Sequence, residues 1–218
     1  MSTVLYKKWS GWLDRIAQEQ LRDLLINRHI FKQLQECTAP HVGTHRGAEL
    51  SEWMVQNYIA FAATTIRRMI ERPSLRWKSI SLRILLQDLA ENDAVLTRQR
   101  YRSLYKNSIA LPFADRDFND IARNKKVSHV TASRIRRDIK EIEAVCDPVE
   151  QLVNKVVAHT EADRRRIRKV KFGQIDQAID LLETTFQRYA LLIHGKVCDP
   201  LVPLDDIDVR ADLRRIWP

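Results

Sequence analysis

The chain has 218 residues, of which 44% are hydrophobic and 30% are charged, as expected for one globular domain. Its formal net charge of +9 favours a polyanionic partner. Three cysteines at wide spacing argue against a disulfide framework, and five glycines leave little material for Gly-rich phosphate loops. The opening residues contain no apolar run of signal-peptide length, and no window reaches the roughly 20 apolar residues that span a bilayer. We therefore expect a soluble, cytoplasmic protein with no membrane contact.

Apolar residues recur at helical spacing over long stretches of the chain. The pattern predicts three long helices, over Ser10–Glu36, Ser51–Arg72 and Gln174–His194. Ser51 is the expected N-cap of the second helix, and Gly195 is the expected C-cap of the third.

Shorter periodic segments predict accessory helices over Leu82–Ala90, Asp93–Tyr105, Asp115–Arg123 and Asp206–Trp217. A further helix is indicated by Ile135, Ile139, Ile142 and Val145. No alternating strand pattern is present. The sequence therefore predicts an all-α fold, a helical bundle of about four long helices plus short accessory helices. We expect the bundle to cover residues 1–199 and a C-terminal tail with a short helix to cover residues 200–218.

Residues 147–163 contain the pattern that says most about function. Asp147 as N-cap, Pro148 in the first turn and Glu150 at the third position predict a new helix that begins at Asp147. This helix has apolar residues at core spacing, and the polar residues Asn154 and His159 stand between or next to them.

An Asn and a His five residues apart in an apolar helix, near the end of an all-helical chain, resemble the active-site helix of the HEPN superfamily. The closest likeness is to the abortive-infection HEPN-like proteins of bacteria. The resemblance implies a helical bundle that forms a homodimer, and a role in phage defence or toxin–antitoxin-like RNA control, with an antitoxin or other protein as a possible partner. Asn154 and His159 would then be catalytic residues of a metal-independent endoribonuclease, in which the histidine moves a proton. Catalytic members have an arginine where this chain has Val153, so we expect the RNase activity to be weakened or lost.

A basic run follows the histidine closely. It comprises Arg164, Arg165, Arg166, Arg168, Lys169 and Lys171. Such a run is either a solvated helix start or a patch that contacts the phosphates of RNA. In a HEPN-type cleft the RNA backbone would pass here, so RNA is the expected partner.

Residues 120–139 support a different hypothesis, because they resemble a helix-turn-helix of the lac-repressor kind. The residues that would read DNA are Ser128, Thr131, Ser133 and Arg134. Lys126 stands where such motifs usually have a glycine, and the segment is embedded between bundle helices rather than placed at a terminus. A DNA-binding transcriptional regulator is therefore the alternative, and a structural or interaction subunit without nucleic acid is a third possibility.

Cys37, His41 and His45 are spaced like metal ligands, but Pro40 and Gly43 interrupt the segment and a fourth ligand is missing. The sequence also lacks a nucleotide-binding or carboxylate-rich metal motif. We therefore expect no metal and no cofactor.

Overall fold

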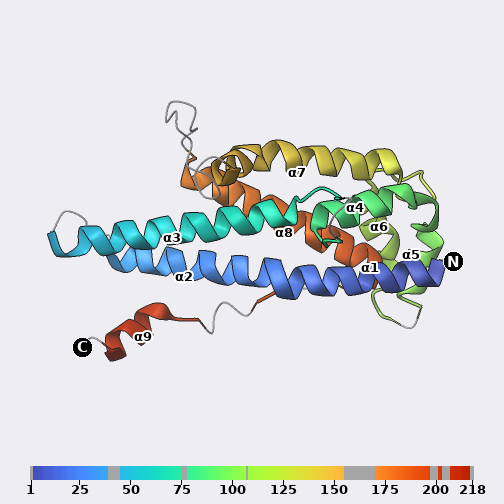
Figure 1. Ribbon diagram of the computed structural model, residues 1–218. Helices are drawn as coiled ribbons and strands as arrows, with labels where there is room; N and C mark the ends of the chain where they lie inside the picture. Colours follow the sequence, from blue (N-terminus) through green and yellow to red (C-terminus); the bar gives the residue numbers. More distant parts are fainter. Residues whose placement is uncertain are drawn as a thin grey trace.

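The computed structural model describes residues 2–38, 45–74, 78–106, 108–154, 170–196, 201–202 and 207–216. These ranges are mostly helical and contain no β-strand, only an isolated bridge between Thr97 and His129. The predicted all-α class is confirmed (Figure 1).

The chain begins with a long helical rod that runs the length of the molecule. It consists of α1 (Ser2–Ile16), a π-helical turn (Ala17–Leu21) and α2 (Arg22–Thr38). The helix starts well before the predicted Ser10, because Trp9 is fully buried and its Nε1 donates to Asp88 Oδ1 at 2.8 Å. Packing thus extends the helix beyond its clearest apolar periodicity.

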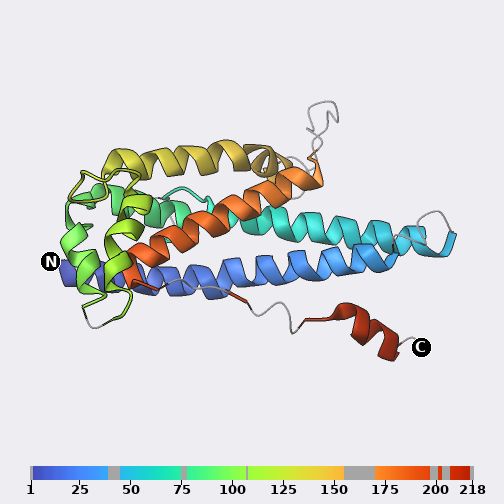
Figure 2. The same cartoon turned by 180° about the vertical axis from the view of Figure 1, so that it is seen from behind.

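Three further long helices complete the bundle: α3 (His45–Met69), α7 (Ala132–Leu152) and α8 (Phe172–His194). Both views show α2 and α3 running in opposite directions, and likewise α7 and α8 (Figures 1 and 2). The predicted N-cap at Ser51 is wrong, because α3 already begins at His45 and packs along α2. Gly195 does end α8 in the left-handed conformation, with φ of 66°, as predicted.

The prediction that a new helix begins at Asp147 is wrong. Helix α7 continues through this position with Pro148 in its interior. Pro148 removes one backbone N–H donor, a change that costs about 3 kcal/mol in a helix interior. Cys146 and Val149 on either side of it are fully buried, so core packing holds the helix together across the proline.

Short elements close one end of the bundle, near the N-terminus (Figure 1). They are α4 (Leu82–Glu91), a 3₁₀ turn (Asp93–Val95), α5 (Arg98–Ser103), a second 3₁₀ turn (Leu111–Phe113) and α6 (Ala114–Ala122). The predicted helix over Asp93–Tyr105 is divided in two, because Thr97 adopts an extended conformation and caps α5 by accepting from Arg100 N. The last helix, α9 (Val209–Ile216), lies beside α2.

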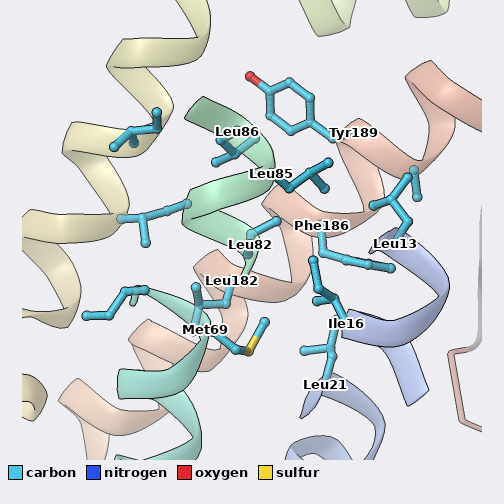
Figure 3. Packing of buried hydrophobic residues seen from close by; sticks show 14 of the residues in the cluster. Leu13, Ile16, Leu21, Met69, Leu82, Leu85, Leu86, Leu182, Phe186 and Tyr189 are labelled. Atoms are coloured by element: carbon cyan, nitrogen blue, oxygen red, sulfur yellow. The ribbon is translucent and has the colours of Figure 1, made fainter. Parts of the chain in front are cut away.

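The core lies where α1, α3, α4, α7 and α8 meet. Figure 3 shows side chains from these helices packed together, among them Ile16 of α1, Leu85 of α4 and Phe186 of α8. Each of these three residues is at most 1% exposed. Helix α4 fills the space between the rod and α7, and its contacts with both fix the position of α7 in the bundle.

A buried charged cluster also joins α7 to α8. The Asp138 carboxylate is 1% exposed and lies 2.5 Å from Arg134 Nη1 and 3.2 Å from Arg188 Nη1. The Tyr189 hydroxyl donates to Asp138 Oδ2 at 2.8 Å. Burial, together with the nearby Asp138 carboxylate, raises the pKa of Tyr189 well above its usual value, so this hydroxyl keeps its proton.

Candidate nucleic-acid interface

Directly after α7 come Val153, which stands where catalytic HEPN members have an arginine, and Asn154, one of the two predicted catalytic residues. Val153 is only 2% exposed and belongs to the hydrophobic core, whereas the next residue, Asn154, is exposed. A residue at position 153 therefore points into the protein, and position 154 faces solvent. The other predicted residues, His159, Arg164, Arg165, Arg166, Arg168 and Lys169, lie outside the described residues.

Arginines of α3 lie beside this end of α7. A cavity of about 370 Å³ lies there, lined by Thr64, Arg67, Arg68, Glu71, Arg72 and Glu150. Glu150 is one helical turn before Asn154 in the sequence. Figure 1 shows the C-terminal half of α3 next to α7, and the two helices are in contact.

Two of these arginines are exposed, and Arg68 also lines a neighbouring cavity with Glu19, whose negative charge it partly compensates. Arg67 and Arg68 are exposed, and neither forms an ion pair or side-chain hydrogen bond with another described residue. Arg72 is weakly held, with its Nε 3.7 Å from Glu143 Oε1. A guanidinium presents its donors in a fork that matches the oxygens of a phosphate, so this end of the bundle has the chemistry to bind one.

The sequence alone does not single out these arginines. An adjacent Arg67–Arg68 pair on the polar side of an amphipathic helix is typical of an ordinary solvated face. Only the packing of α3 against α7, far away in the sequence, places the pair beside Glu150. The two adjacent arginines are the one feature of the sequence that could have pointed to this site.

The residues of the DNA-binding alternative surround the start of α7. Helix α6 is followed by its C-cap Arg123 in the left-handed conformation (φ of 50°). Thr131 caps α7 by accepting from Arg134 N at 3.3 Å. Ser128 and Ser133 are exposed, and Thr131 is half-buried. The Arg134 side chain is buried and paired with Asp138, so it could reach a DNA base only if that ion pair broke.

The described part of the chain offers no metal centre and no membrane span. No three His, Cys, Asp or Glu side chains in it lie together as metal ligands do, and none of its helices is both long and apolar enough to cross a bilayer. Of the considered zinc ligands, Cys37 is a half-buried free thiol, while His41 and the side chain of His45 lie outside the described residues. No family model, curated protein or solved structure matches the chain.

Proposed function

We propose that the chain is a HEPN-like protein that binds RNA at the face formed by α3 and the end of α7, with RNase activity weakened or lost. The observation that carries the proposal is the pair Arg67 and Arg68, exposed and without an ion pair or side-chain hydrogen bond among the described residues, beside an α7 end where Val153 is buried. The proposal also includes what the HEPN resemblance implies: a homodimer, and a role in phage defence or toxin–antitoxin-like control.

The buried position of Val153 favours binding over catalysis. Cleavage by a ribose 2′-hydroxyl needs a cation held at the phosphate as charge develops, and the loss of one such contact typically reduces the rate by about 10²–10³. Val153 offers no charge, and its side chain packs into the core. Arg67 and Arg68 supply positive charge, but no neighbouring described side chain holds either one in a fixed position.

The composition of the cavity favours contacts to phosphates over contacts to bases. No aromatic side chain is among its described lining residues, so none of them can stack on an unpaired base. Glu71 and Glu150 share the cavity with Arg67, Arg68 and Arg72, and Glu143 beside Arg72 compensates the one remaining positive charge of the lining. We therefore expect moderate affinity, strong dependence on salt and little preference for sequence.

The test is a charge reversal with a matched control elsewhere on the surface. We expect Arg67→Glu/Arg68→Glu to weaken binding of a mixed-sequence single-stranded RNA by about 10-fold or more at roughly 100 mM salt, measured by fluorescence anisotropy. The control is Arg136→Glu/Arg137→Glu, an exposed arginine pair on α7 outside the cavity. The affinity of this control should stay within about 3-fold of wild type, as expected for charges beyond a Debye length of about 10 Å.

Two outcomes count against the proposal. Equal losses in the two variants would show that only the net charge matters. A loss confined to Arg136→Glu/Arg137→Glu, and seen with duplex DNA rather than RNA, would favour the DNA-binding alternative, because these arginines follow Arg134 on the helix that would read DNA.

A further inference from the structure

A second basic surface lies at the other end of α7, where the segment before the helix meets α5. It is a groove of about 690 Å³, lined by Thr97, Arg98, Gln99, Arg102, Lys125, Lys126, Val127 and Ser128. Four of these side chains are cationic and none of the eight is acidic. The groove lining therefore has a larger excess of positive charge than the lining of the cavity beside Arg67.

Hydrogen bonds fix the shape of this groove. Arg98 N donates to Ser128 O at 2.8 Å and Val130 N donates to Leu96 O at 3.0 Å, so the segment before α7 pairs with the start of α5. The Arg98 guanidinium donates to Val127 O at 3.1 Å and to Asn119 Oδ1 at 2.7 Å. The backbone that carries the lysines is thus held in place before any ligand binds.

The cations at the rim are available to a ligand. Lys125 and Lys126 are exposed, and neither side chain pairs with another described residue. Arg102 is 53% exposed and lies 3.0 Å from Asp115, which also pairs with Arg98 from outside the groove lining. One carboxylate thus compensates part of the charge of the two arginines, and both lysines stay uncompensated.

We propose that this groove binds the phosphates of a nucleic-acid backbone, as a site separate from the arginines of α3. The segment that resembles a helix-turn-helix then contacts phosphates and not base edges, since Arg134 is turned into the core and none of the described residues that line the groove is aromatic. Binding at the groove depends on salt and is indifferent to sequence.

The two basic surfaces act independently because of their separation. Helix α7, which lies between them, has 21 residues. At about 1.5 Å per residue its ends are about 30 Å apart, roughly three Debye lengths at 0.1 M salt. A charge change at one surface therefore leaves the electrostatic potential at the other almost unchanged, and the two can be tested one at a time.

The experiment uses the full chain and a single-stranded RNA of about 24 nucleotides in two unrelated sequences, with anisotropy read at several salt concentrations. We expect Lys125→Glu/Lys126→Glu to weaken binding by about 10-fold for both sequences, and to reduce the slope of log affinity against log salt by about 1.4, from roughly 0.7 per lost phosphate contact. Lys125→Gln/Lys126→Gln should give a smaller loss of the same kind. Arg22→Glu/Lys32→Glu, two exposed cations of α2 that line neither basic surface, is the matched control and should keep its affinity within about 3-fold of wild type. Circular dichroism verifies that each variant keeps its helices.

Unchanged affinity in both lysine variants, or a loss for one sequence only, would overturn the inference. Its failure is distinguishable from failure of the proposed function. Loss in Arg67→Glu/Arg68→Glu alone supports the α3 face and refutes the groove, whereas loss in the lysine variants alone supports the groove and refutes the α3 face.

Discussion

Replacing Asp138 with alanine should destabilise the protein by about 3–5 kcal/mol, because it leaves the Arg134 guanidinium buried without a counter-charge. Arg134 is 6% exposed as a residue, and its Nε and Nη2 already have no hydrogen-bond partner among the described groups. Tyr189 would also lose the acceptor of its buried hydroxyl. Urea unfolding followed by circular dichroism measures the loss, and the melting temperature should fall by about 6–20 °C.

Two comparisons on the same helix show whether burial of the charge is the cause. Glu143→Ala removes a partly exposed carboxylate, 31% exposed, that lies 2.7 Å from Arg83, and should cost about 0–1 kcal/mol. Arg134→Met/Asp138→Leu removes both buried charges and should recover at least half of the Asp138→Ala loss. If Asp138→Ala costs no more than Glu143→Ala, then solvent screens the Asp138 cluster and its charges are not buried.

Val153→Arg should destabilise the protein by about 2–4 kcal/mol and should not create an efficient nuclease. Val153 is 2% exposed and packs in the core, so a guanidinium placed there either loses its water or distorts the end of α7. The matched control is the neighbouring Asn154→Arg, which adds the same charge at an exposed position and should change stability by no more than about 0.5 kcal/mol.

The same variants are assayed for cleavage of a mixed RNA without divalent ions. We expect wild type to cleave slowly or not at all, Val153→Arg to gain nothing, and any residual activity to disappear in His159→Ala. Fast cleavage by wild type that survives His159→Ala would show that the HEPN-type assignment of this histidine is wrong. A Val153→Arg variant that is both stable and active would show that position 153 is open to the ligand.

The helical class follows directly from the sequence, but several helix boundaries depend on packing. Gly195 was a reliable stop because its left-handed conformation is a local property of the residue. Ser51 and Asp147 have good capping chemistry, yet both lie inside helices, because contacts of α3 with α2 and burial of Val149 continue the helix. Local capping preferences of about 1 kcal/mol are overridden by such packing.

The candidate sites were less predictable because they depend on contacts between distant segments. The sequence pattern drew attention to Asn154 and to the segment around Ser128, and the structure places both at the surface. The sequence pattern does not reveal that Val153 and Arg134 point inward, or that α3 and α5 supply the cations next to the two ends of α7. Those facts depend on tertiary packing that periodicity alone does not encode.

The most direct test of RNA binding at the α3 face is how far Arg67→Glu/Arg68→Glu changes the salt dependence of affinity for single-stranded RNA. If Arg67, Arg68 and Arg72 each contact one phosphate, the slope of log affinity against log salt should be about −2 or steeper, from roughly 0.7 per contact. This slope should become shallower by about 1.4 in Arg67→Glu/Arg68→Glu. No detectable wild-type binding at about 50 mM salt, or a slope that is the same in wild type and in Arg67→Glu/Arg68→Glu, would contradict RNA binding at the α3 face.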